Sequence, residues 1–357
     1  MNAMTTNSTS GRARPFGRRT KPWKAWWKRL WTIAAGLGCL AAAASDYPIY
    51  GAGDYVENNG VGVYYDGALY IFDTESAQLV PSYDICCHLF LNGRYYSGLP
   101  SLNGSSYAQV APLIIEGELW LFHTGENQCL YYKKTTNPTK GWESSWHELP
   151  ISRTSNNLEI APVYNPLTHR LAVYYFSNNY IWWVYSDNYG ATWSVPRPVT
   201  SVELVSGAPS AVYCPQGSSD TLLAIRTYAS TNGANSVVVY NVSNGTALPG
   251  PTTFPGVIKD GRPFVTSLDE SRYIVTWKSA ADGSVWMSRM GTGTGVWQPA
   301  LQVVGQEVTW SPTGAVGYSS SGGLWYGDFY IIWSDKIGPI RSSWTMRLLE
   351  YWTIPGP

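Results

Sequence analysis

Short runs of aliphatic, aromatic and β-branched residues, separated by clusters of turn residues, fill the chain from about residue 46 to its end. Residues 162–196 show the pattern best, with apolar runs over 162–165, 170–176 and 179–185 before a polar turn. Runs of about four to eight such residues, bounded by Gly, Pro, Asn or Asp, are typical of β-strands. No amphipathic run long enough for a helix separates them, so the pattern predicts an all-β fold rather than a doubly wound α/β fold.

A phrase in which proline opens a β run recurs about every fifty residues. Its prolines are Pro112, Pro162, Pro209, Pro263 and Pro312. They are spaced by 50, 47, 54 and 49 residues, and residues 67–72 (Gly-Ala-Leu-Tyr-Ile-Phe) match 117–122 (Gly-Glu-Leu-Trp-Leu-Phe), which adds a sixth unit at the front. Six units of about 52 residues with four short strands each predict a six-bladed β-propeller of four-stranded antiparallel blades over residues 46–357.

The aromatic content fits this architecture. The chain has 18 Trp and 26 Tyr, and large flat side chains are suited to the gaps between neighbouring blades. We therefore expect the recurring Trp residues to pack between blades. The fourth strand of the last blade has two candidate segments, residues 348–354 and a segment near residues 47–55.

Residues 1–45 differ from the rest of the chain in charge and hydropathy. Residues 1–29 hold eight basic residues and no acidic one, and Lys and Trp mix through 21–31, which suits a membrane interface. We expect this segment to be disordered or juxtamembrane. Residues 30–45 are uncharged and shorter than the about 20 residues of a spanning helix, so they predict a signal peptide, with an uncleaved anchor as the alternative. Either one would export residues 46–357.

Charge and cysteine usage exclude several classes of function. Residues 46–357 carry 16 basic and 24 acidic residues, which argues against nucleic acid as a partner. The four cysteines and four histidines of this part show no metal-ligand spacing, and no glycine-rich nucleotide loop is present. The sequence therefore predicts neither a metal site nor a cofactor.

The position three residues before each opening proline, or before Gly62 in the first unit, is polar in every unit. These residues are Asn59, Gln109, Glu159, Ser206, Asp260 and Thr309. Because the inner strands of a propeller start near its central opening, we expect this polar column to ring one mouth of the axis. It suggests a sugar-binding or hydrolytic centre, with Arg262 as a cationic contact and Trp310 as a stacking platform. The alternative is that strand starts are solvated and therefore polar by default.

One turn carries a motif. Residues 186–193 (Ser-Asp-Asn-Tyr-Gly-Ala-Thr-Trp) resemble the Asp-box of sialidase-like six-bladed propellers, Ser-x-Asp-x-Gly-x-Thr-Trp, with Asn188 in the place of the Asp. The resemblance implies an outer turn between the third and fourth strands of a blade, far from any catalytic centre. Its structural residues would be Ser186, Asn188, Gly190, Thr192 and Trp193.

The resemblance does not extend to sialidase chemistry. Enzymes of that family clamp a substrate carboxylate with three arginines, and the place of the first arginine is Gly60 here. Its loss removes a bidentate contact that other residues replace poorly. Arg262 lies one residue before its proline instead of two, so within a strand its side chain should point the other way.

Three functions follow as hypotheses. The leading one is lectin-like, non-catalytic binding of surface glycans or glycoproteins, since the layout is also similar to that of bacterial and fungal propeller lectins and repetition suits multivalent binding. The second is a glycoside hydrolase in which Glu159 and Asp260 form the carboxyl pair. The third is a protein-interaction scaffold that uses the rim of the propeller.

Overall fold

A computed structural model describes most of the chain beyond residue 45. The described residues are 46–49, 55–56, 60–76, 83–91, 94–96, 99–106, 108–151, 159–228, 235–258, 261–269, 271–291, 295–305, 307–308, 311–321, 324–337 and 341–354. The chain divides into two compact units, residues 1–43 and 44–357. The predicted basic segment (1–29) and nearly all of the apolar segment (30–45) belong to the first unit, and both lie outside the described residues, so those predictions stay untested.

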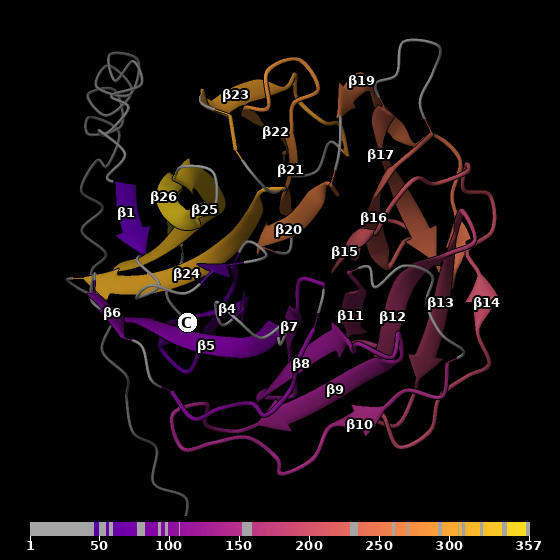
Figure 1. Ribbon diagram of the computed structural model, residues 1–357. Coiled ribbons are helices and arrows are strands. Elements are labelled where there is room, and N and C mark those ends of the chain that lie inside the picture. Colours follow the sequence, from indigo (N-terminus) through magenta and orange to yellow (C-terminus); the bar gives the residue numbers. More distant parts are fainter. Residues whose placement is uncertain are drawn as a thin grey trace, which may run out of the picture. The chain divides into compact units, whose positions relative to one another are not determined.

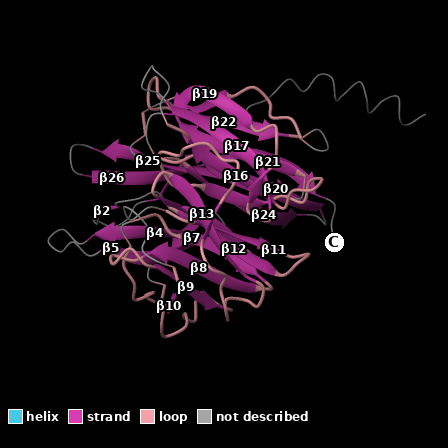
Figure 2. Cartoon of the chain, turned by 90° about the vertical axis from the view of Figure 1, so that its right-hand side faces the viewer, coloured by secondary structure: helices cyan, strands magenta, loops and turns pink. Residues whose placement is uncertain are grey.

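The described part of the second unit consists of strands and loops (Figure 2). Among these residues no helix is long and apolar enough to cross a membrane. The strands form six antiparallel sheets, here called blades 1 to 6 in chain order. This confirms the predicted all-β propeller and its number of blades. The prediction of four strands in every blade is wrong for blades 1 and 4, which contain five strands each.

Blades 1 to 3 follow one another along the first half of the unit. Blade 1 contains β2 (Tyr55–Val56), β3 (Val61–Tyr65), β4 (Ala68–Ser76), β5 (Tyr83–Leu91) and β6 (Arg94–Tyr96). Blade 2 contains β7 (Ala111–Ile115), β8 (Glu118–Thr124), β9 (Leu130–Thr135) and β10 (His147–Glu148). Blade 3 contains β11 (Ala161–Asn165), β12 (Arg170–Ser177), β13 (Tyr180–Ser186) and β14 (Arg197–Pro198).

Blades 4 to 6 complete the ring. Blade 4 contains β15 (Ser210–Tyr213), β16 (Thr221–Arg226), β17 (Asn235–Ser243), β18 (Thr246–Ala247) and β19 (Thr252–Ile258). Blade 5 contains β20 (Phe264–Asp269), β21 (Arg272–Lys278), β22 (Val285–Met290) and β23 (Leu301–Val304). Blade 6 contains β24 (Thr313–Ser321), β25 (Leu324–Ile337), β26 (Arg341–Ile354) and, from the start of the unit, β1 (Asp46–Ile49).

The inner strands close a ring around the axis. They are β3, β7, β11, β15, β20 and β24. Each contacts the inner strand of the next blade, and β24 contacts β3, so the last colour of the chain meets the first in Figure 1. The opening prolines lie at or just before the start of these strands, where a missing N–H costs no ladder hydrogen bond.

The ring is closed by a strand from the beginning of the second unit. β1 pairs antiparallel with β26, with Asp46 opposite Arg347 and Ile49 opposite Trp344. The last blade therefore takes its fourth strand from residues 46–49. Residues 348–354, the other candidate, belong to β26, the third strand of that blade.

Tryptophans pack between blades, as predicted. Trp142 of the blade 2 outer loop meets Phe72 of blade 1 edge to face, with ring centroids 5.8 Å apart. The ring centroids of Trp193 and Tyr132 of blade 2 are 6.2 Å apart, and those of Trp297 and Phe254 in β19 of blade 4 are 6.4 Å apart. In each case the indole that follows the third strand of one blade covers the preceding blade, which buries sheet faces that a single blade leaves open.

Candidate functional site

The predicted polar column is only partly described by the structure. Asn59, Asp260 and Trp310 lie outside the described residues, as does Thr309 of the same column. Gln109, Glu159 and Arg262 are described and lie just before β7, β11 and β20. The inner strands thus start close together, and three of the predicted ligand-binding residues lie at that end of the axis.

Arg262 crosses the axis and contacts four other blades, three of them through its side chain. Its Nη2 donates to Gln109 Oε1 at 2.5 Å, and its Nη1 donates to the carbonyl oxygens of Pro209 (3.2 Å) and Ile160 (3.5 Å). Its backbone N–H donates to Ser311 Oγ at 2.9 Å. Arg262 precedes β20 and is not part of a strand, so the alternation that predicted an opposite direction for its side chain does not apply. The guanidinium joins the starts of blades 2, 3 and 4 to blade 5.

The guanidinium of Arg262 is a buried charge. Only 4% of the residue is exposed, and burial lowers its pKa, while the nearby Glu159 carboxylate acts in the opposite direction. Arg262 Nε has no hydrogen-bond partner among the described residues. Gln109 is equally buried and is engaged by Arg262, whereas Glu159 is half-buried. Of the three, Glu159 is therefore the residue that a ligand outside the ring could reach.

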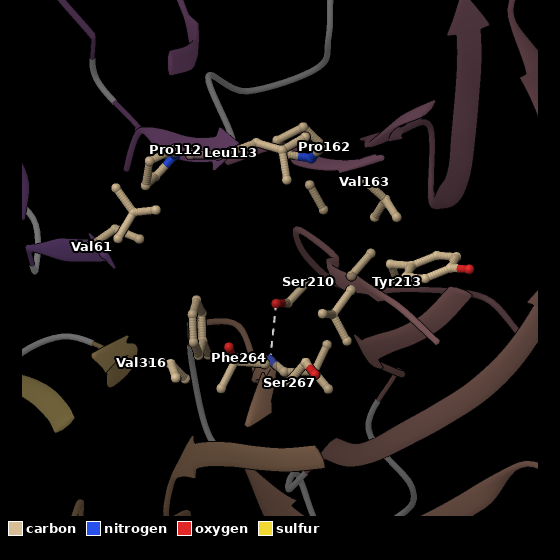
Figure 3. A pocket seen from close by; sticks show the side chains of 18 of the residues that line it. Val61, Pro112, Leu113, Pro162, Val163, Ser210, Tyr213, Phe264, Ser267 and Val316 are labelled. Carbon is tan, nitrogen blue, oxygen red and sulfur yellow. Dashed lines mark hydrogen bonds between the residues drawn. The ribbon is translucent and has the colours of Figure 1, made fainter. Parts of the chain in front are cut away.

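An axial cavity of about 390 Å³ lies along the inner strands and has Arg262 in its lining. Figure 3 shows this cavity from close by. Its walls come from all six inner strands and are mostly apolar, with Val61, Leu113, Val163, Phe264 and Val316 among the lining residues. The hydroxyl of Ser210 also lines it but accepts a hydrogen bond from Val265 N–H at 3.0 Å. No carboxylate belongs to the described lining. This cavity is therefore a poor match for a hydrolytic centre, which needs carboxyl groups.

The Asp-box-like turn follows β13 and leads to β14, as the resemblance implied. Ser186 Oγ accepts the N–H groups of Asn188 (3.3 Å) and Gly190 (2.8 Å), and Asn188 Oδ1 accepts the N–H of Thr192 at 2.8 Å. Asn188 Nδ2 donates to Thr192 Oγ1 at 2.9 Å, which an Asp could not do. Gly190 has φ +79° and its carbonyl accepts from Tyr132 Oη in blade 2. The turn thus shapes a junction between blades and contributes no group to the axis.

Blade 2 contains a second turn of the same kind that its sequence conceals. Thr135 Oγ1 accepts the N–H of Asn137 at 2.9 Å, and Asn137 Oδ1 accepts both the N–H (3.1 Å) and the hydroxyl (2.7 Å) of Thr139. Hydroxyl and amide therefore play the parts of Ser186 and Asn188. Because of Pro138 and a changed spacing before Gly141 and Trp142, the sequence no longer matches the motif, although the hydrogen bonds of the turn are kept.

A polar cluster missed by the sequence analysis lies between blades 2 and 3. It consists of Glu116, Tyr164, His169 and Tyr189, and we call it the Glu116 cluster. Tyr164 Oη donates to Glu116 Oε1, and His169 Nδ1 lies 3.3 Å from that oxygen. The hydroxyls of Tyr164 and Tyr189 each lie 3.0 Å from His169 Nδ1. Three hairpins or turns from two blades bring these four side chains together.

The Glu116 cluster has unused hydrogen-bonding capacity at the surface. The side chains of Glu116 and His169 are 49% and 57% exposed, and Tyr189 is 42% exposed. Tyr164, Tyr189 and Glu116 all lie against His169 Nδ1, and two of the cluster's groups share one oxygen of Glu116. A carboxylate offers four acceptor directions and an imidazole two nitrogens, so part of this capacity is unused. Burial and the Glu116 carboxylate raise the pKa of Tyr164, so its phenol stays protonated and acts as a donor.

Positive φ angles hold three members of the cluster in place. Glu116 (+48°), His169 (+56°) and Tyr189 (+53°) are all in the left-handed region that non-glycine residues rarely adopt. Each is the turn residue that aims its side chain at the junction. The Glu116-Gly117 turn between β7 and β8, matched to Asp66-Gly67 in blade 1, was the only signal for this site in the sequence.

Comparison with known proteins supports the fold. No protein-family model matches the chain, sialidase-like families included, and no curated protein matches it. A protein of unknown function from Dyadobacter fermentans is 12% identical, covers 85% of this chain and 98% of its own, and superposes with a TM-score of 0.59. SapL1 lectin, solved with α-methyl fucoside, is 11% identical over 82% of this chain and 96% of its own, with a TM-score of 0.55.

The third similar structure is the Aleuria aurantia lectin, a six-bladed β-propeller with a fucose recognition mode. It is 10% identical over 82% of this chain and 95% of its own, with a TM-score of 0.53. At these identities the likeness shows a shared fold alone. The chain is thus a six-bladed propeller similar in architecture to fucose-binding lectins.

Proposed function

We propose that this chain is an exported, non-catalytic carbohydrate-binding propeller that recognises surface glycans through the Glu116 cluster. The observation that carries the proposal is a half-exposed carboxylate, imidazole and tyrosine gathered between two blades with unused hydrogen-bonding capacity. Export is the part of the proposal that rests on the N-terminal segment.

The chemistry of the cluster suits a sugar. Glu116 can accept hydrogen bonds from a pair of sugar hydroxyls, and charge-assisted bonds of this kind are about twice as strong as neutral ones. His169 can donate or accept, and the exposed ring of Tyr189 offers a flat face for the C–H side of a pyranose. Leu167, 79% exposed in the same blade 3 turn as His169, adds apolar surface.

The similar lectins indicate where to begin. Two structures with this architecture are described by their binding of fucose or a fucoside, so fucosylated glycans are the first probes for this chain. Glu159 stays a proposed second contact at the axial mouth together with Asn59, Asp260 and Trp310. Gln109 and Arg262 bind each other across the ring, so we do not count them among the sugar contacts.

Non-catalytic binding is favoured over hydrolysis by the distribution of carboxylates. A glycosidase needs two carboxyl groups about 5 to 9.5 Å apart. Glu116 is the one carboxylate in its cluster, and the described axial lining contains none. A hydrolase would have to use Glu159 with Asp260, and only Glu159 is described.

A glycan array with the full chain tests the proposal, with bound protein and released sugar both measured over time. The wild type should bind fucosylated or other surface glycans and release no sugar. Glu116→Gln keeps an acceptor for Tyr164 but loses the charge, so it should weaken binding about tenfold or more.

Glu118→Gln is the matched control. Glu118 lies two residues away in the same hairpin, but its carboxylate pairs with Lys134 Nζ at 3.0 Å and not with the cluster. This variant should bind as the wild type does. Equal binding by wild type and Glu116→Gln, or steady release of sugar, would overturn the proposal.

A further inference from the structure

The axial cavity is built unlike a sugar site. Its walls are mostly aliphatic and aromatic, and its described lining contains one charged group, Arg262. Arg262 lies where the inner strands start, and Tyr164 and Ser267 line the cavity near the ends of β11 and β20. Five strand residues span about 16 Å. The cavity is therefore an apolar channel with a cation at one end, and its 390 Å³ falls in the range of about 300 to 1,000 Å³ seen for small-molecule sites.

The cation at the end of the channel is incompletely satisfied. A guanidinium has five N–H donors, and Arg262 makes three side-chain hydrogen bonds, all to uncharged oxygens of Gln109, Ile160 and Pro209. Its Nε has no partner among the described residues although the residue is 4% exposed. A buried donor without an acceptor costs free energy that an incoming acceptor would recover.

Among the residues that the structure describes, the charge of Arg262 is only partly balanced. Glu159 is the described carboxylate that acts on it, yet the two form no hydrogen bond in the described structure. Glu159 is half-buried, so solvent screens its charge more than it screens the buried guanidinium. An anion inside the channel would therefore meet a positive end and apolar walls.

We propose that the axial channel binds a small amphipathic monocarboxylate, with its carboxylate on Arg262 and its hydrocarbon chain along the inner strands. The class follows from the two features together. The apolar walls favour a hydrocarbon chain, and a buried guanidinium whose Nε–H has no partner among the described residues favours a planar anion that can take a forked contact. This site is separate from the Glu116 cluster in chemistry, although Tyr164 belongs to both.

Calorimetric titration of the full chain with sodium octanoate tests this proposal. A series of butanoate, hexanoate and octanoate should tighten about fourfold per methylene, because each buried methylene contributes about 0.8 kcal/mol. 1-Octanol has the same chain without the charge and should bind at least about tenfold more weakly than octanoate. Glu159→Gln should strengthen octanoate binding, since it removes a negative charge beside Arg262.

Two variants show where the probe binds. Val316→Trp fills the channel from β24, where Val316 is half-buried in the lining, and should abolish octanoate binding. Val195→Trp adds the same side chain at a 67% exposed position of blade 3 and should leave binding unchanged. Near-ultraviolet circular dichroism checks that both fold. Arg262→Met should also abolish binding, but it removes bonds between blades, so the test does not depend on it.

The proposal is overturned by any of three results. They are no heat with octanoate in the folded wild type, equal affinity for octanoate and octanol, or unchanged binding in the folded Val316→Trp chain. Each outcome is distinct from failure of glycan binding, which is measured with different probes and with variants of Glu116. Either proposal can therefore fail without the other.

Discussion

The junction between blades 2 and 3 and the junction between blades 3 and 4 share a backbone plan and differ in chemistry. In each, the outer turn of the later blade lies against the earlier blade through a glycine of nearly the same φ, +79° at Gly190 and +76° at Gly245. The residue before the glycine is Tyr189 in one and Asn244 in the other. Tyr189 meets His169 in the turn before β12, and Asn244 meets Arg170 at the start of β12.

At the junction of blades 3 and 4 the polar groups satisfy one another. Arg170 forms a fork with Asp187, with Nε to Oδ1 at 2.7 Å and Nη2 to Oδ2 at 3.1 Å, and its Nη1 donates to Asn244 Oδ1 at 2.6 Å. Its guanidinium also lies 4.2 Å from the ring centre of Tyr185. This arrangement uses both edges and one face of the guanidinium, so it joins the blades and leaves little for a ligand.

At the junction of blades 2 and 3 the groups compete for too few partners. Two phenols and a carboxylate surround one nitrogen of His169, and much of Glu116 and His169 faces solvent. Equivalent junctions of one propeller can therefore either hold blades together or present unsatisfied polar groups. We expect the first kind to matter for stability and the second for binding.

The largest effect should come from filling the glycine positions. A Cβ on Gly245 would lie 2.1 Å from the buried indole of Trp183, whereas one on Gly190 would lie 2.9 Å from the hydroxyl of Tyr132. Gly245→Ala should cost about 3 kcal/mol or more of unfolding free energy, from overpacking plus a left-handed alanine. Gly190→Ala should cost less, because a hydroxyl at the end of a side chain can move further than a buried indole.

Gly117→Ala is the control for the backbone contribution. Gly117 has φ +79° with no heavy atom within 4 Å of a built Cβ, so its cost should be about 1 kcal/mol. Urea unfolding of the three variants measures the differences. Equal losses at positions 117 and 245 would contradict the close contact with Trp183.

A second prediction concerns the buried histidine His123. Burial lowers the pKa of His123 from 6.5 to about 4, with Lys133 acting in the same direction. Between these two values the unfolded chain binds a proton that the folded chain does not, so stability falls as the pH drops from about 6.5 to 4. The loss at the acid end is about 3 kcal/mol.

Unfolding free energies at pH 7 and pH 4.5 measure this effect, and His123→Phe should reduce the difference. His123 stacks on Tyr131 and meets Trp146, so a phenyl ring is a reasonable replacement. An unchanged acid sensitivity in His123→Phe would show that other groups govern it. Binding assays at acid pH need this control, because a less stable chain would also bind less.

The junctions should also differ in what their polar residues support. Arg170→Met removes the fork to Asp187 and should cost about 1 to 2 kcal/mol of stability, discounted because the Arg170 and Asp187 side chains are 27% and 52% exposed. It should leave glycan binding unchanged. Thermal melting and the glycan array measure the two effects, and lost binding in a folded Arg170→Met chain would contradict the separation of roles.

The smallest effect concerns one hydroxyl. Tyr189→Phe removes the contact to His169 Nδ1 at 3.0 Å but keeps the aromatic face. Glycan binding should weaken only about fivefold, the value of roughly one hydrogen bond, and stability should change little because Tyr189 is exposed. Titration with the best glycan from the array measures it, and a complete loss of binding would mean that the ring alone does not supply the main contact.

The sequence predicted the fold because the fold repeats. The opening prolines and the matched hairpins 67–72 and 117–122 serve local structure within one blade. Because every blade needs the same local structure, these features recur at a regular spacing along the chain. The turn at 186–193 was equally visible because its hydrogen bonds are local. The similar turn at Asn137 was not predicted, because the same hydrogen bonds form there with a different sequence and spacing.

The candidate site could not be predicted in the same way. Glu116 and Tyr189 are 73 residues apart, and they meet only because blades 2 and 3 lie side by side. The aligned polar column compared the starts of inner strands, whereas this cluster forms at their ends. Arg262 lies just before β20, next to the predicted column, but its burial depends on carbonyl oxygens of other blades that no sequence pattern encodes.

We propose that the Glu116 cluster binds sugar while the equivalent polar group at the next junction does not. The most direct measurement is glycan-array binding of the full chain as wild type, Glu116→Gln and Arg170→Met, with released sugar monitored. We expect binding without release of sugar in the wild type, loss of binding in Glu116→Gln and retained binding in a folded Arg170→Met. Retained binding in Glu116→Gln, or lost binding in a folded Arg170→Met, would contradict this assignment.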